Sequence, residues 1–261
     1  MSRIPILGSP QIDARLDGTP PRVRTRSLLC VRAWDGVLAP LNEGMSVDYL
    51  GRSATATIYA SDGTSGALVA SAPAFSSEDW DGDGVREEDA LVLSAEEALR
   101  YYDASSNQLL WDTTAKVIRI DGYERGNALV AGAPYFSFTN NTASGAYLAV
   151  LGSGDGKIGL RHYNGTSTVV SELPIANGDR YSLIGQYANN GSVRVRMIRN
   201  GGAEVVGALS DPLLPETVWG GGAGVKARIN ECGVPVRGVQ ALRYLAVFGG
   251  TATRQQITEV L

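Results

Sequence analysis

The chain has 261 residues, with 27 acidic and 23 basic side chains, a formal net charge of −4 and a single histidine, His162. A general nucleic-acid binder needs a cationic face, so we expect no nucleic acid among the partners. The single histidine excludes a zinc site built from several histidines and fits poorly with a serine triad. No apolar run reaches the roughly 18 residues of a membrane span, and the first ten residues lack the apolar core of a signal peptide. We therefore expect no membrane insertion.

The first 27 residues differ from the rest in composition. Proline and arginine recur in this segment, at Pro5, Pro10, Pro20, Pro21, Arg15, Arg22, Arg24 and Arg26. Proline blocks both a helix and a central strand, so residues 1–27 are predicted to form an extended arm, with a disordered leader as the alternative. We expect the four arginines to serve assembly, because an arm that grips a neighbouring subunit would have this composition.

From residue 28 onward, short apolar runs alternate with glycine and asparagine turns, which predicts a single β-sandwich domain over 28–261. The runs predict strands at 27–33, 55–59, 117–120, 147–151, 158–163, 181–187, 193–198 and 241–248. Three pairs predict type I′ hairpin turns, because their residues accept positive φ: Asp155-Gly156, Asn164-Gly165 and Asn200-Gly201. Apolar and charged residues alternate over 193–199, which predicts one face on a core and one toward water or a partner.

Helix signals are few. Ser94 and Glu97 have the spacing of a capping box, which predicts a helix of at most two turns over 98–102. Residues 253–261 predict a short docking helix. Cys30 and Cys232 lie far apart in the sequence, and we expect two buried free thiols; a disulfide is the alternative if the first and late strands are neighbours.

An acidic loop over 79–89 has the spacing of a cation site. Its candidate calcium ligands are Asp79, Asp81, Asp83, Val85 and Glu87. Carboxylates at positions 1, 3 and 5 can wrap a hard cation, the glycine at position 6 permits a sharp turn, and position 7 adds a backbone carbonyl. Position 12 is Ala90, where an EF-hand has glutamate. The alternative to a calcium site is a solvated acidic turn without metal. If the loop holds a structural Ca²⁺, EDTA and Asp81→Ala should each lower the melting temperature.

Other positions bear on sugar chemistry. Aromatic side chains form platforms for sugars, and the candidate ligand-binding residues are Trp34, Trp219, Tyr101 and Tyr102. Glycoside hydrolysis needs two carboxyl groups, and the segment 87–92 ends in Val92 where a concanavalin A-like hydrolase has the second glutamate. We therefore expect no catalytic residues. His162 is expected to be a structural histidine within a strand.

Two stretches resemble known families. Residues 181–187, 191–195 and the Asn200-Gly201 turn, followed by 243–248 and 253–261, resemble the closing half of concanavalin A-like or laminin G-like jelly rolls. This resemblance implies an all-β, concanavalin A-like jelly-roll β-sandwich with an extended N-terminal arm and very few short helices. Within it, residues 28–125 would form a front portion that carries the acidic loop, and 126–261 a laminin G-like core.

Residues 52–59, 62–63, 72–75 and 90–98 resemble a run found in bacteriophage tail and virion proteins. The resemblance implies a non-enzymatic virion structural protein of the tail, fibre or head decoration, which forms a homo-oligomer and binds other virion proteins. Two alternatives stay open. One is a lectin-like, carbohydrate-binding module that recognises host-surface glycan, and the other is a glycan-cleaving enzyme.

Overall fold

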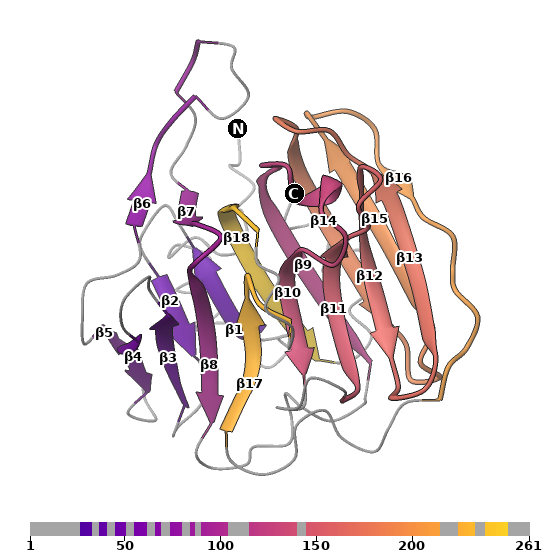
Figure 1. Cartoon of the computed structure of the whole chain (residues 1–261), viewed down its shortest axis with the longest axis horizontal. Coiled ribbons are helices and arrows are strands. Elements are labelled where there is room, and N and C mark those ends of the chain that lie inside the picture. Colours follow the sequence, from indigo (N-terminus) through magenta and orange to yellow (C-terminus); the bar gives the residue numbers. More distant parts are fainter. Residues whose placement is uncertain are drawn as a thin grey trace, which may run out of the picture.

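Two antiparallel β-sheets lie face to face in the computed structural model of the chain (Figure 1). The structure describes residues 27–32, 37–40, 45–50, 55–61, 66–68, 74–79, 84–86, 90–103, 115–139, 145–214, 224–232 and 238–249. These residues contain strands and one short 3-10 turn, η2 (Asn127–Leu129), and no helix among them could span a membrane. The predicted all-β jelly-roll sandwich is confirmed. The predicted arm over 1–27 and the predicted docking helix over 253–261 fall outside these ranges, apart from Ser27.

The first sheet, sheet A, has β18 near its centre. Its main path runs β16 (Val205–Val206), β15 (Val193–Arg199), β14 (Arg180–Tyr187), β9 (Lys116–Tyr123), β18 (Gln240–Gly249), β1 (Ser27–Arg32) and β2 (Val37–Pro40). Beyond this path, β7 (Ala90–Leu93) pairs with β18, and β6 (Ala74–Ser76) pairs with β7. Segments from both ends of the described sequence therefore meet within one sheet, as β1 and β18 do.

The second sheet, sheet B, brings together strands from the first and second halves of the chain. Its order is β13 (Thr168–Pro174), β12 (Lys157–Tyr163), β11 (Tyr147–Gly152), β10 (Pro134–Thr139), β17 (Gly224–Ile229), β8 (Ala98–Asp103), β3 (Met45–Leu50), β4 (Thr55–Ser61) and β5 (Gly66–Leu68). The two halves of the chain meet between β17 and β8. On its other side, β17 pairs with β10, which is also from the second half.

The core lies between the sheets and follows the two-residue period of the strands. In β15, Val193, Val195 and Met197 are buried and belong to the core, while Arg194 and Arg196 are half-buried on the other face. The predicted alternation over 193–199 is confirmed. Phe136 and Phe138 of β10 are fully buried, and their rings meet edge to face with centroids 4.9 Å apart. All eight predicted strands are present.

The predicted helix over 98–102 is wrong, because these residues form β8. The capping-box residues make a turn between β7 and β8 instead: the Glu97 amide donates to the Ser94 carbonyl at 3.0 Å, and the Ser94 amide donates to Glu97 Oε2 at 2.7 Å. The Tyr49 hydroxyl donates to Glu97 Oε1 from the neighbouring β3. One of the two capping-box hydrogen bonds is thus formed, from the Ser94 amide to the Glu97 carboxylate, but pairing of β8 with β3 and β17 keeps the following residues extended.

The hairpin turns are confirmed as turns, but only one has the predicted type. Asn200 and Gly201 have φ of 51° and 68°, as a type I′ turn requires. In the hairpins β11–β12 and β12–β13, the glycines Gly156 and Gly165 have positive φ while the preceding Asp155 and Asn164 do not. Type I′ is wrong there because the strands are joined by four-residue loops, 153–156 and 164–167.

Candidate functional site

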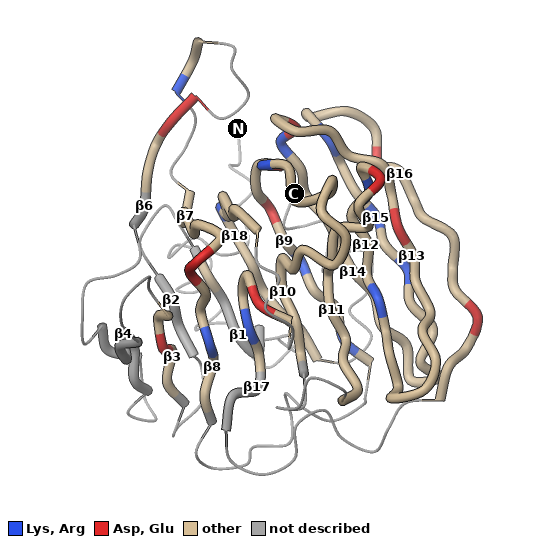
Figure 2. Tube along the Cα trace, viewed as in Figure 1, with Lys and Arg blue, Asp and Glu red and all other residues tan. Residues whose placement is uncertain are grey.

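The strand register places one row of outward-facing positions across seven strands of sheet B. The row, from β3 to β13, contains Asp48, Arg100, Arg228, Ser137, Ala149, Arg161 and Val170. Its neighbours along the strands, among them Leu99, Phe138 and Leu160, belong to the core. Because successive side chains of a strand alternate between faces, the row lies on the outer face of sheet B. Figure 2 shows the charged positions of β3, β8 and β17 side by side.

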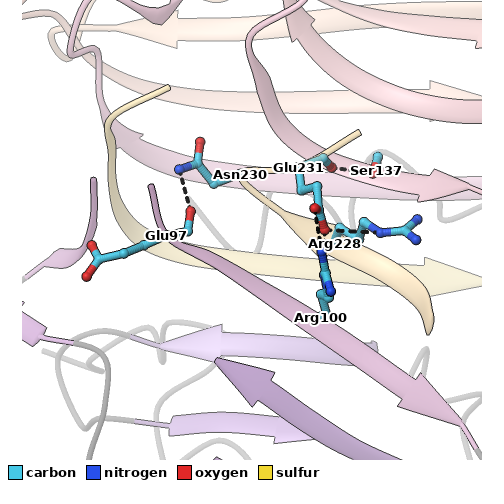
Figure 3. Close-up of polar contacts among 6 residues, drawn as sticks. All are labelled: Glu97, Arg100, Ser137, Arg228, Asn230 and Glu231. Carbon is cyan, nitrogen blue, oxygen red and sulfur yellow. Dashed lines mark hydrogen bonds and ion pairs between the residues drawn. The ribbon is translucent and has the colours of Figure 1, made fainter. Parts of the chain in front are cut away.

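Glu231, directly beyond β17, forms ion pairs with two guanidinium groups in this row. Arg100 donates through Nε and Nη2 to the two carboxylate oxygens, both at 2.7 Å, and Arg228 Nε lies 3.3 Å from Glu231 Oε2 (Figure 3). The hydrogen bond with Glu231 raises the pKa of Arg100. Burial lowers the pKa of Arg228, against the attraction of Glu231. The Glu231 side chain is 11% exposed, so this charge cluster is largely removed from water.

The backbone on either side of this cluster is fixed by polar side chains. The Ser137 hydroxyl donates to the Glu231 carbonyl at 2.7 Å (Figure 3). Asn230 has φ of +62°, and its Nδ2 donates to the carbonyls of Ser94, Glu97 and Gly238 at 2.7–3.0 Å. Since asparagine tolerates the left-handed region and supplies both donors and an acceptor, it suits this junction. Asn230 ties the end of β17 to the turn before β8.

A second group on the same outer face lies three strands away from Arg100, on β11 and β12. Tyr147 and Tyr163 are cross-strand neighbours, with ring centroids 5.4 Å apart and ring planes inclined by 41°. Arg161 lies two residues before Tyr163 on the same face of β12, and its positive charge acts against burial on the pKa of Tyr147. All three side chains are half-buried, so each keeps an accessible part. We call Tyr147, Arg161 and Tyr163 the tyrosine–arginine patch.

The groups of the patch are held in place by their neighbours. Burial raises the pKa of Tyr147 more than Arg161 lowers it, so the phenol stays protonated at neutral pH. The Tyr163 hydroxyl donates to the Gly165 carbonyl at 2.5 Å. Tyr147 packs beside Ala149, Leu151 and the buried Cys232. The patch thus offers two aromatic ring surfaces and one cation in a supported arrangement, which suits a ligand with both apolar and polar edges.

Cys232 is a free, buried thiol, so the disulfide alternative with Cys30 is not formed. Burial raises the pKa of Cys232 to about 11. A thiol with this pKa is protonated at neutral pH and is a poor nucleophile, because the thiolate is the reactive form. Cys232 is therefore a packing residue.

His162 lies within a strand, as expected, and it is buried. It faces the core from β12, its Nδ1 donates to the Gly191 carbonyl at 3.0 Å, and its ring meets Tyr187 edge to face at 5.1 Å. Burial lowers the pKa of His162, which favours the neutral imidazole in the folded chain.

Most of the sequence-predicted site residues lie outside the described ranges. These are Asp81, Asp83, Glu87, Trp34, Trp219, Arg15, Arg22, Arg24 and Arg26. Of the remaining loop residues, Asp79 accepts a hydrogen bond from the Gly84 amide at 2.8 Å, and Val85 is exposed. Within the described ranges, no three carboxylate, histidine or cysteine side chains gather as a metal site. The calcium ion stays a prediction.

Two predicted ligand contacts lie next to each other in β8. Tyr101 is fully buried in the core, so it is a packing residue and presents no platform. Tyr102 is half-buried and points to the opposite face of β8 from Tyr101. The sequence reasoning missed the row in sheet B and the tyrosine–arginine patch. Alternation over 158–163 would have placed Arg161 and Tyr163 on one face, but only the register of β11 brings Tyr147 beside them.

No protein family model matches the chain, and no curated protein matches its sequence. A solved structure with a similar fold is domain 4 of AbnA, a GH43 extracellular arabinanase from Geobacillus stearothermophilus, in complex with arabinotriose. It is 18% identical with a TM-score of 0.51, and the match covers 72% of this chain and 82% of that one. At this identity the likeness shows the fold alone.

Two further structures are more distant. An arabinofuranosidase complexed with arabinofuranosyl-α-1,2-xylobiose is 9% identical with a TM-score of 0.49, and the match covers 90% of this chain and 61% of that one. The NanB sialidase from Streptococcus pneumoniae is 12% identical with a TM-score of 0.42, and the match covers 56% of this chain. The chain spans about a quarter, 24%, of that sialidase.

Proposed function

We propose that the chain is a carbohydrate-binding β-sandwich and that the tyrosine–arginine patch contacts the glycan. The observation that carries this proposal is the pair of half-buried tyrosine rings, 5.4 Å apart, beside Arg161 on the outer face of sheet B. Aromatic rings contact the apolar faces of sugar rings, and a guanidinium donates hydrogen bonds to sugar oxygens. Few and well-placed polar groups among apolar ones are typical of small-ligand sites.

The fold supports the proposal. Domain 4 of AbnA, which has a similar fold, was solved in complex with arabinotriose. The same fold supports binding without implying any one ligand. The patch itself, and not the likeness, identifies where this chain would bind.

Binding without cleavage is the activity that the patch supports. Glycoside hydrolysis needs two carboxyl groups about 5 to 9.5 Å apart, whereas the patch consists of two phenols and one guanidinium. The virion role, assembly as a homo-oligomer and a location in the virion stay predictions from the sequence resemblance. A glycan-binding face would serve such a virion protein in recognising a host surface.

Affinity electrophoresis of the purified chain through gels that contain neutral and acidic polysaccharides tests the proposal. We expect at least one polysaccharide to retard the wild-type chain, and Tyr147→Ala to weaken that binding about tenfold through loss of a ring contact. The comparison variant is Tyr102→Ala, which removes the half-buried tyrosine of β8 that the sequence named as a candidate ligand contact; because Tyr102 lies outside the patch, we expect its binding to equal that of the wild type.

Two results would overturn this proposal. One is the absence of retardation by every polysaccharide tested, and the other is equal binding by the wild type and Tyr147→Ala. Release of reducing ends from the bound polysaccharide would contradict the binding-only role.

A further inference from the structure

We infer that the glycan residue bound at the tyrosine–arginine patch carries a carboxylate, and that Arg161 binds it. This inference rests on the proposed function and adds the substrate class. It follows from how positive and negative charges are distributed over the outer face of sheet B, and from the hydrogen-bonding groups that remain on Arg161.

The charged residues of the row and Glu231 leave one positive charge in excess. Three guanidinium groups, from Arg100, Arg228 and Arg161, face two carboxylates, from Asp48 and Glu231. Both carboxylates act at the Arg100 end: Glu231 binds Arg100 and Arg228, and Asp48 raises the pKa of Arg100. The excess positive charge therefore falls at Arg161.

Within the described ranges, no carboxylate forms an ion pair with Arg161. The adjacent strand β13 carries Glu172 on the same outer face, but this carboxylate pairs with Lys157 at 3.0 Å. The guanidinium of Arg161 lies near the Tyr147 hydroxyl, whose pKa it lowers against the effect of burial. A guanidinium has five N–H donors, so most of those on Arg161 remain available to a ligand.

The chemistry of the available donors selects the ligand group. The planar fork of a guanidinium matches a carboxylate, which it binds through two parallel charge-assisted hydrogen bonds. Arg161 and Tyr163 lie two residues apart on one face of β12, a separation of about 6.6 Å along a strand. A sugar ring that rests on the tyrosine rings can therefore place a carboxylate of the same residue, or of the next one, at Arg161.

The test compares acidic polysaccharides with their carboxyl-reduced forms by isothermal titration calorimetry. The probes are polygalacturonate, alginate, hyaluronate and polysialate, each paired with the polymer in which the carboxylates have been reduced to alcohols. We expect at least one acidic polymer to bind, its reduced form to bind about tenfold more weakly, and added salt to weaken the binding.

Variants of Arg161 show whether this side chain is responsible. Arg161→Gln should weaken binding of the acidic polymer about tenfold, and Arg161→Lys should have an intermediate effect because it keeps the charge but loses the fork. Arg194→Gln is the matched control, because Arg194 is a half-buried arginine on the outer face of sheet A. Its binding should equal that of the wild type, and all variants should keep the wild-type melting temperature within a few degrees.

The outcomes separate this inference from the proposed function. Binding to neutral polymers alone, equal binding of an acidic polymer and its reduced form, or an unchanged affinity in Arg161→Gln would overturn the carboxylate inference and leave the carbohydrate-binding role standing. Binding to none of the neutral and acidic polymers would overturn both.

Discussion

Glu231 is the residue on which the charge cluster of sheet B depends. Its two carboxylate oxygens accept from Arg100, and Oε2 also lies 3.3 Å from Arg228 Nε. The side chains of Arg228 and Glu231 are 10% and 11% exposed. Removing one partner of a buried ion pair leaves an uncompensated charge, which destabilises far more than the loss of a surface pair.

Glu231→Gln should lower the free energy of unfolding by about 2–4 kcal/mol, because two guanidinium groups would lose the carboxylate that they share. Glu172→Gln is the matched control. Its pair with Lys157 is about a third exposed on both sides, so we expect a clearly smaller loss than in Glu231→Gln. Urea denaturation of both variants measures the difference in the free energy of unfolding. Equal losses in the two variants would contradict the stabilising role of Glu231.

Glu124 is a second buried carboxyl group, and it lies within the sandwich. It accepts hydrogen bonds from the Ala128 amide at 2.9 Å and from the Tyr135 hydroxyl. Burial raises its pKa above the ordinary value of 4.5, although the hydrogen bonds act in the opposite direction. The folded state therefore holds the proton more tightly than the unfolded state does.

This pKa shift predicts the sign of a pH effect. Because the folded pKa is the higher one, the stabilising contribution of Glu124 is complete below pH 4.5 and is lost as the pH rises through the folded value. Glu124→Gln removes this titration and keeps a carbonyl acceptor for the Ala128 amide. The stability of the wild type relative to Glu124→Gln, measured by urea denaturation from pH 4 to pH 7.5, should fall with rising pH. A rise would show that the pKa shift has the opposite sign.

At the scale of secondary structure, the turn before β8 shows that local sequence can predict a turn without predicting the element that follows it. The Ser94 amide donates to the Glu97 carboxylate as in a capping box, and this bond is satisfied equally well in a turn between strands. The choice between helix and strand for 98–103 depends on β3 and β17, which are about 50 and 125 residues away. No periodicity within six residues contains that information. Runs that alternate more clearly, such as 193–199, could be assigned from the sequence alone.

Two glycines distinguish an intrinsic backbone preference from close packing. Gly191 has φ of +79°, and a Cβ there would lie 1.5 Å from the Leu213 carbonyl oxygen, whereas at Gly201, with φ of +68°, a Cβ would meet nothing within 4 Å. Gly201→Ala should destabilise by about 1 kcal/mol through φ alone. Gly191→Ala should destabilise by about 3 kcal/mol or more, since the segment at Leu213 must also move. Similar melting temperatures for the two variants would contradict this packing.

At the scale of the whole molecule, composition and turn residues were sufficient to predict two packed sheets, and they were insufficient to predict the functional face. Tyr147, Arg161 and Arg100 are unremarkable where they stand in the sequence. They share a face because seven strands from both halves of the chain pair in a particular register. Conversely, Tyr101 and Tyr102 are adjacent and similar in the sequence but differ in the fold: Tyr101 is buried in the core and Tyr102 is half-buried on the opposite face.

The central claim is that glycan binds the outer face of sheet B at β11 and β12. An NMR titration of the isotope-labelled chain with the polysaccharide fragment that binds most tightly tests it directly. We predict the largest shift changes at the backbone amides of 147–149 and 161–163, with little change at 193–199 in sheet A. Shift changes concentrated at 193–199, with 147–149 and 161–163 unaffected, would contradict the claim.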